Sequence, residues 1–201
     1  MGDATIRNFG VVIAICGALF VFGGETFSIW SFGLEVDLDD GDESSLTFLF
    51  GAEELYIEYD GDDTPDDDDV KYDDGDEDLD ELEDFFANLK LMFYGLIGCG
   101  IGLAYIGNSG ENMESIPTVA GVTALLSVVI MAYTFTSLPE AFEDDTEIFE
   151  SIDEDPSFFV NMERDDDGGD IHLKAMPHVG FFLPVVSLTL AGLLINPRLM
   201  D

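Results

Sequence analysis

Basic residues are scarce in this chain of 201 residues, which has six Lys or Arg against 44 Asp or Glu and a formal net charge of −38. Proteins bind nucleic-acid phosphates through clustered Lys and Arg, so no nucleic-acid partner is expected. Cysteine is also scarce: Cys16 and Cys99 both lie in uncharged apolar runs, where we interpret them as small hydrophobes. Neither a disulfide framework nor a cysteine metal site is therefore expected.

Signatures of catalysis and transport are missing as well. The sequence has no Gly-x-Ser-x-Gly, no phosphate loop and no paired metal-binding motif. Its two histidines, His172 and His178, have no metal-ligand spacing and are interpreted as a surface and an interfacial residue. The apolar runs hold no Asp, Glu, Lys or Arg that could carry an ion across a membrane. The sequence therefore predicts neither an enzyme nor a cofactor.

Hydrophobic residues nonetheless make up 47% of the chain. They concentrate in four uncharged runs, residues 8–24, 91–110, 115–139 and 175–197. A helix rises about 1.5 Å per residue and the hydrocarbon core of a bilayer is about 30 Å thick, so each run is long enough to cross, the first only just. The sequence predicts four transmembrane helices, with a cleaved signal peptide as the alternative for the first run.

The acidic residues lie between these runs. Residues 25–90 hold 26 acids and two lysines, and residues 140–174 hold 14 acids, one arginine and one lysine. Two spans separate these segments, so both are expected on one side of the cell membrane. Orientation follows Lys and Arg near span ends, which divide evenly here. We place the termini in the cytoplasm because the connection at 107–115, which lies on their side, is short.

The expected parts follow from this topology. They are the N-terminus with the first span (1–24), an extracellular loop (25–90), two spans with a short cytoplasmic connection (91–139), a second extracellular loop (140–174), and the last span with the C-terminus (175–201). The lipid bilayer is the first expected partner, and another membrane protein or a second copy of the chain is the next.

Period-two patterns predict β-structure in the first acidic segment. Phe32, Leu34 and Val36 alternate with polar residues or glycine, and similar runs follow at 46–50 and 55–59. These patterns predict two or three antiparallel strands with one apolar face. Residues 58–84 contain 17 acids among 27 residues and little to bury, which predicts a solvated or mobile Asp-rich insertion.

The second acidic segment is typical of a β-hairpin. Residues 158–164 and 170–176 flank the run Asp165-Asp166-Asp167-Gly168-Gly169, whose glycines tolerate positive φ. Its strands are expected to join the sheet of the first segment. The predicted fold class is membrane α-helical: a four-helix transmembrane bundle with a small antiparallel β-sheet built from the two extracellular loops.

The composition and one motif resemble known groups of proteins. The acidic excess is similar to that of extremely halophilic archaea, in which dense carboxylates keep a surface hydrated while about 1 M salt shortens the Debye screening length to about 3 Å.

The run Trp30-Ser31-Phe32-Gly33-Leu34 is similar to the Trp and Gly-Leu that open the first loop of the claudin-like tetraspan family. That resemblance implies the same four-span topology and an outer sheet, with Trp30, Gly33 and Leu34 as a structural corner. The chain has no tryptophan after Gly33-Leu34 and no cysteine pair in the loop, so a paracellular role is not carried over.

Spaced acids offer a weak cation site. Glu163, Asp165 and Asp167 precede Gly168 as in part of a calcium loop, but Lys174 stands where a bidentate Glu is expected. We therefore expect diffuse cations at the acidic surface.

Small residues in the second apolar run predict close helix packing. Gly98 and Gly102 lie four residues apart, which would place both on one face of a helix. We expect their helix partner to lie within the same chain, with a helix of another subunit as the alternative.

Two functional hypotheses remain. The first is a non-enzymatic, multi-pass membrane protein of a halophile whose acidic extracellular β-module serves interaction or scaffolding. The alternative is an accessory subunit of a transporter or membrane enzyme whose acidic loops collect cations.

Overall fold

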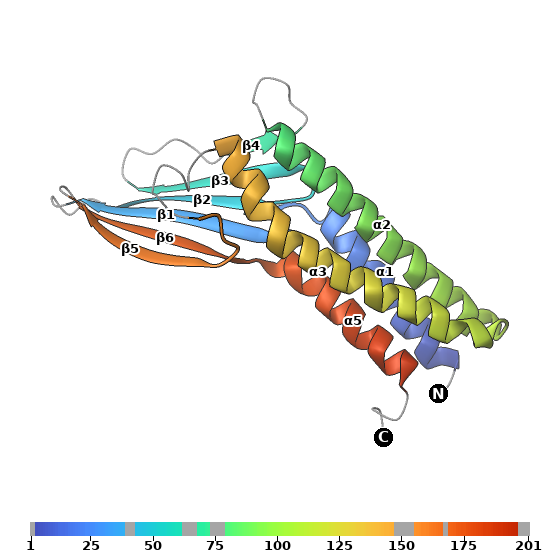
Figure 1. The fold of residues 1–201 in the computed structure, drawn as a ribbon. Coiled ribbons are helices and arrows are strands. Elements are labelled where there is room, and N and C mark those ends of the chain that lie inside the picture. Colours follow the sequence, from blue (N-terminus) through green and yellow to red (C-terminus); the bar gives the residue numbers. More distant parts are fainter. Residues whose placement is uncertain are drawn as a thin grey trace. The chain divides into compact units, whose positions relative to one another are not determined.

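The computed structural model describes residues 3–38, 43–61, 68–72, 79–146, 155–166 and 169–196 (Figure 1). The chain forms two compact units. Unit 1, called the helical unit below, comprises Met1–Gly23, Ala87–Thr134 and Phe181–Asp201. Unit 2, called the sheet unit, comprises Gly24–Phe86 and Phe135–Gly180.

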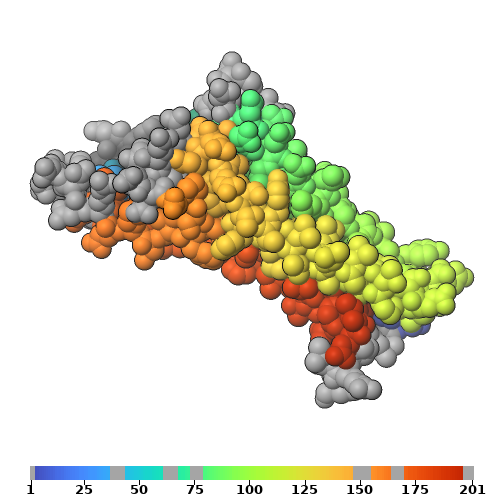
Figure 2. Space-filling model, in the orientation of Figure 1, coloured from blue at the N-terminus to red at the C-terminus, as the bar shows by residue number. Residues whose placement is uncertain are grey.

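The helical unit is built on four apolar helices: α1 (Asp3–Phe22), α2 (Asp80–Ser109), α3 (Ile116–Thr146) and α5 (Phe182–Ile195). Each helix contributes two side chains to one buried cluster: Ile6, Ile13, Leu103, Ile106, Ile116, Ala120, Ala191 and Leu194. Large apolar side chains such as Leu91, Ile101 and Leu125 are exposed, and in Figure 2 side chains of α2 (green), α3 (yellow) and α5 (red) lie on the visible surface of this unit. α1, α2 and the segment Met113–Thr146 are long and apolar enough to cross a membrane.

The fourth apolar run is shorter as a helix than predicted. Residues 175–177 end strand β6, and α5 begins only at Phe182 and contains 14 residues. At about 1.5 Å per residue α5 is roughly 21 Å long, less than a hydrocarbon core of about 30 Å. The predicted start of the last helix at residue 175 is too early, because a strand buried on one face and a membrane span look equally apolar in a hydropathy pattern.

Backbone contact between α1 and α2 depends on glycines other than those predicted. A Cβ on Gly10 would meet the backbone of Gly100 and Leu103, and a Cβ on Gly100 would meet the backbone of Gly10 and Ala14. At Gly98 and Gly102, in contrast, an added Cβ would have nothing within 4 Å. The prediction that Gly98 and Gly102 pack against a helix of the same chain is therefore wrong, because the contacting face of α2 is turned toward Gly100.

The sheet unit contains one six-stranded antiparallel sheet in the order β4-β3-β2-β1-β6-β5. Its strands are β1 (Trp30–Leu38), β2 (Glu43–Phe50), β3 (Glu54–Gly61), β4 (Asp68–Lys71), β5 (Val160–Asp166) and β6 (Gly169–Pro177). The first three strands and the β5–β6 hairpin lie where the alternating patterns predicted them. β1 pairs with β6, so the two acidic segments form a single sheet, as expected.

Two predictions about the first acidic segment need correction. The stretch interpreted as a solvated or mobile insertion contains β4, where Val70 pairs with Leu55 beside exposed Asp68 and Asp69. Residues 62–67 and 73–78 of this stretch lie outside the described residues. The expected corner at Trp30, Gly33 and Leu34 is instead part of the uninterrupted strand β1, which is paired on both sides. The Gly33 position is an ordinary extended one, because paired strands hold the backbone straight there.

A carboxylate from the end of α3 caps the start of α2 within the sheet unit. The Asp145 carboxylate accepts hydrogen bonds from the backbone N–H groups of Leu82 at 2.9 Å and Glu81 at 3.3 Å. The first N–H groups of a helix have no partner in their own helix, so this carboxylate satisfies two of them.

We expect Asp145→Ala to lower the free energy of unfolding by about 1 kcal/mol, the usual effect of losing a helix cap. The measurement is thermal unfolding, together with hydrogen exchange at the amides of Glu81 and Leu82, which should accelerate. Exposed Asp144 provides the matched control, and Asp144→Ala should leave the free energy of unfolding and the exchange of these two amides unchanged. Equal effects of the two substitutions would contradict a specific capping role.

Candidate functional site: the polar face of the sheet

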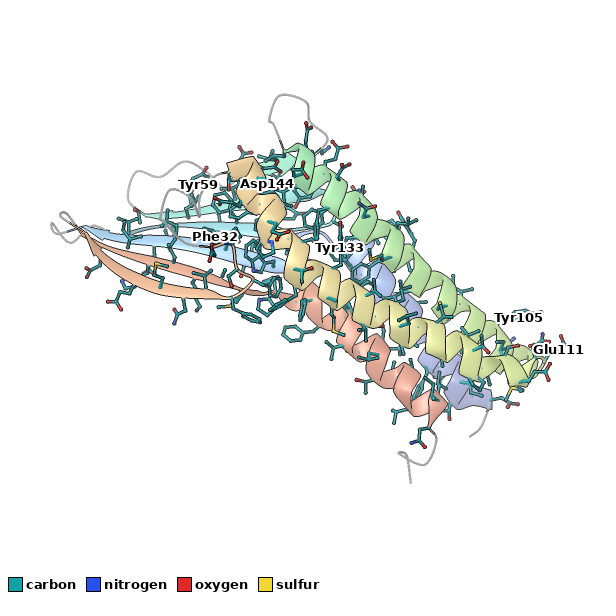
Figure 3. The ribbon with its side chains drawn as sticks, in the orientation of Figure 1. Phe32, Tyr59, Tyr105, Glu111, Tyr133 and Asp144 are labelled. Atoms are coloured by element: carbon teal, nitrogen blue, oxygen red, sulfur yellow. The ribbon has the colours of Figure 1, made fainter. Side chains whose placement is uncertain are left out.

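The two faces of the sheet differ in character because side chains alternate along each strand. One face carries Trp30 and Phe32 of β1, Phe50 of β2, Leu55 of β3 and Leu173 of β6, which are all buried. Phe142 of α3 packs on this face with its ring 5.2 Å from that of Phe32, the residue labelled on β1 in Figure 3. This apolar face is therefore covered around Trp30, Phe32 and Phe50, whereas Leu34 of β1 and Leu46 of β2 farther along the same face are half-buried.

Trp30 is the centre of the aromatic cluster on the apolar face. Its ring lies 5.0 Å from Phe50, 5.7 Å from Phe142 and 5.9 Å from Phe158, between ring centroids. Its indole Nε1–H donates to the backbone oxygen of Phe158 at 2.8 Å. Trp30 thereby joins the strands of the first acidic segment to α3 and to the chain before β5.

The opposite face is polar beyond the row of Met176, Ser31 and Leu49, in which Leu49 is buried, and the strand register arranges its polar residues in rows across the sheet. The first row contains a glycine between groups that donate hydrogen bonds: from β5 to β2 it consists of Asn161, Lys174, Gly33 and Thr47. Glu58 on β3 continues this row beyond Thr47. Lys174 belongs to a chain with only six Lys or Arg, so it marks an unusual position on an acidic surface.

The second row combines carboxylates with an imidazole. It consists of Glu163, His172, Glu35 and Ser45, on β5, β6, β1 and β2. The next register positions on the same four strands are all acidic: Asp165, Asp170, Asp37 and Glu43. Charge on these four strands therefore changes from one lysine to several carboxylates within three rows.

A groove of about 390 Å³ opens on this face. Polar side chains of both rows line it, namely Glu35, Ser45, Thr47, Asn161, His172 and Lys174, with Gly33 among them. Gly33 has no side chain to fill the space between Thr47 and Lys174. The groove thus exists where a glycine interrupts a row of larger residues.

Two tyrosines stabilise the neighbouring strands as neutral hydrogen-bond donors. Burial, with the nearby Glu54 carboxylate, raises the pKa of Tyr56 to about 12, and its hydroxyl donates to Glu54 Oε1 at 3.2 Å. Burial also raises the pKa of Tyr72 well above its usual range, and its hydroxyl donates to the Gly51 backbone oxygen at 3.3 Å. Both hydroxyls keep their protons throughout the physiological pH range.

The structure describes only two of the three residues of the expected cation site, Glu163 and Asp165. Glu163 is exposed on β5 opposite His172, and Asp165 lies opposite Asp170 at the end of the hairpin. Asp167 lies outside the described residues. Among the residues that the structure describes, no three His, Cys, Asp or Glu side chains are grouped so that they could hold a metal ion. The second histidine, His178, donates its backbone N–H to the Ile29 oxygen at 3.1 Å beside the sheet.

The groove was missed at the sequence level. Alternation indicates that Gly33 and Glu35 share one strand face, and that His172 and Lys174 share another. It does not indicate that β1 pairs with β6, nor in which register, so it could not place these four residues side by side.

Comparison with known proteins gives no assignment for this site. No protein-family model matches the chain, and no curated protein matches it.

Proposed function

We propose that the chain is a non-enzymatic, multi-pass membrane protein whose sheet unit lies outside the cell and acts as an interaction platform. The proposal includes four membrane crossings, cytoplasmic termini and a natural environment of concentrated salt. The short helix α5 would cross with the help of the apolar turn at Val179–Phe181 before it, or by local thinning of the bilayer.

The pairing of β1 with β6 carries this proposal. These strands come from segments that are separated in sequence by α2 and α3, two of the helices long and apolar enough to cross a membrane. Strands of one sheet must lie on the same side of a membrane, so the chain has to cross an even number of times between them. Two crossings by α2 and α3 satisfy that requirement.

The asymmetry of the sheet supports a role in interaction. Its apolar face is covered by aromatic side chains around Trp30, whereas its polar face carries an open groove. The sheet does not need its polar face to be buried in order to be stable, so this face is available to bind a partner.

Photo-crosslinking tests this role directly. A photoreactive amino acid at Glu58 or Glu163, both exposed on the polar face, should crosslink one and the same partner in native membranes. A control at exposed Asp144 on α3 should not. Absence of a crosslink at both polar-face positions would contradict the platform role, and a transporter or enzyme bound in equal amount would instead identify the chain as an accessory subunit.

The sheet unit is also expected to require salt. Carboxylates repel one another over a Debye length of about 30 Å at 0.01 M salt, which shortens to about 3 Å at 1 M. Dialysis from molar KCl into dilute buffer should therefore shift the emission of buried Trp30 to longer wavelength and reduce strand content, while helix content is kept. Unchanged emission and strand content across this range would contradict the proposed adaptation.

A further inference from the structure

We propose that the groove at Gly33 binds a small zwitterion, a molecule that carries a carboxylate and a cationic nitrogen a few ångströms apart. This inference does not rest on the platform role, because it concerns a small ligand and can be tested on the purified chain. It assigns a ligand class to the groove of about 390 Å³ on the polar face.

The first row of the groove is suited to a carboxylate. Lys174 offers an ammonium group, Asn161 an amide and Thr47 a hydroxyl, and register places all three beside Gly33. A charged donor with neutral donors beside it is the usual environment of a bound carboxylate, since hydrogen bonds to ionised groups are the stronger ones.

The second row is suited to the cationic end of the same molecule. The Glu35 carboxylate lines the groove one row away from Lys174. A simple anion would meet the Glu35 carboxylate, and a simple cation would meet Lys174. A zwitterion aligned across the two rows places opposite charges together at both ends.

The groove is of a size for such a ligand. Small-molecule sites usually have volumes of about 300–1,000 Å³, and this groove lies at the lower end of that range. Gly33 creates the space, and a Cβ there would meet only the Lys174 oxygen and Thr47 Oγ1, both at the ordinary contact distance of 3.7 Å. Folding therefore does not require glycine at position 33, and a side chain there can occupy the groove without straining the strand.

The test is calorimetric titration of the full chain in lipid nanodiscs, at a salt concentration that keeps it folded. The probes are glycine and glycine betaine as zwitterions, acetate as the anion alone, methylammonium as the cation alone, and glucose as a neutral polar molecule. At least one zwitterion should bind about tenfold or more tightly than acetate, methylammonium and glucose, because both charged ends contribute.

Three variants locate the site. Lys174→Gln and Glu35→Gln should each weaken binding of the zwitterion about tenfold, and Gly33→Val should abolish it by filling the groove while β-structure is retained, since valine favours strands. Matched controls are Lys71→Gln on β4 and Glu58→Gln on β3, exposed residues that do not line the groove, which should bind as the unmodified chain does.

Several results would overturn the proposal. Acetate or methylammonium binding as tightly as the zwitterions would show a site for one charge only. Absence of binding of both zwitterions to the folded chain would show that the groove is an empty feature of the sheet. Binding that persists in Gly33→Val, with its sheet intact by circular dichroism, would place the ligand elsewhere.

Discussion

Replacing Trp30 by alanine is expected to lower the free energy of unfolding of the sheet unit by about 3–5 kcal/mol, the range for deletion of a buried tryptophan or phenylalanine side chain. Trp30 is fully buried and its ring contacts those of Phe32, Phe50, Phe142 and Phe158. Removal of the indole leaves a cavity at the junction of strands β1 and β2 with α3. Thermal unfolding followed by circular dichroism in the strand region measures the change.

Two controls separate packing from hydrogen bonding. Trp30→Phe keeps most of the ring but leaves the backbone oxygen of Phe158 without the indole donor, which should cost about 1–2 kcal/mol. Phe159 also contacts the Phe158 ring but is 56% exposed, so Phe159→Ala should have a clearly smaller effect than Trp30→Ala. A Trp30→Ala effect no larger than that of Phe159→Ala would contradict the central place of Trp30 in the core.

The second large effect is expected at Gly100 in α2. A side chain at Gly100 would collide with the backbone of α1 at Gly10 and Ala14, and neither backbone can move aside without separating the two helices. We expect Gly100→Val to lower the stability of the helical unit by about 3 kcal/mol, the upper part of the usual range for overpacking. The measurement is thermal or denaturing-detergent unfolding in the same lipid.

Gly98 provides a control on the same helix with the same substitution. A side chain at Gly98 would meet nothing within 4 Å, so Gly98→Val should change stability by no more than about 0.5 kcal/mol. Because both positions lose a helical glycine, the difference between them measures the α1–α2 contact alone. A larger effect at Gly98 than at Gly100 would show that the sequence-based choice of helix face was correct after all.

Sequence patterns predicted the fold wherever one physical signal dominated. Alternation of apolar and polar residues located β1, β2 and β3, and Gly168-Gly169 between two runs located the β5–β6 hairpin. The length of the uncharged apolar runs predicted the helices α1, α2 and α3. In each case the structural feature has a local signal in the sequence: a strand with one buried face alternates apolar and polar residues, and a long apolar helix is an uncharged run.

The sequence was less informative where tertiary contacts decide the structure. β4 was missed because Asp68, Asp69 and Lys71 are exposed, and only pairing with β3 makes this acidic stretch a strand. Gly98 and Gly100 look alike in sequence, and only the rotation of α2 against α1 distinguishes the packed glycine from the open one. The polar groove required the register between β1 and β6, which no local pattern specifies.

Accessibility of three single cysteines tests the proposed topology most directly. In a background with Cys16→Ala and Cys99→Ala, cysteine is introduced by Glu58→Cys in β3, Glu163→Cys in β5, or Glu111→Cys in the connection between α2 and α3, where Figure 3 labels Glu111. Intact cells are treated with a membrane-impermeant maleimide. We predict that Glu58→Cys and Glu163→Cys are labelled, and that Glu111→Cys is labelled only after the membrane is permeabilised. Labelling of only one of the two sheet positions, or of Glu111→Cys in intact cells, would contradict a single extracellular sheet joined by two membrane crossings.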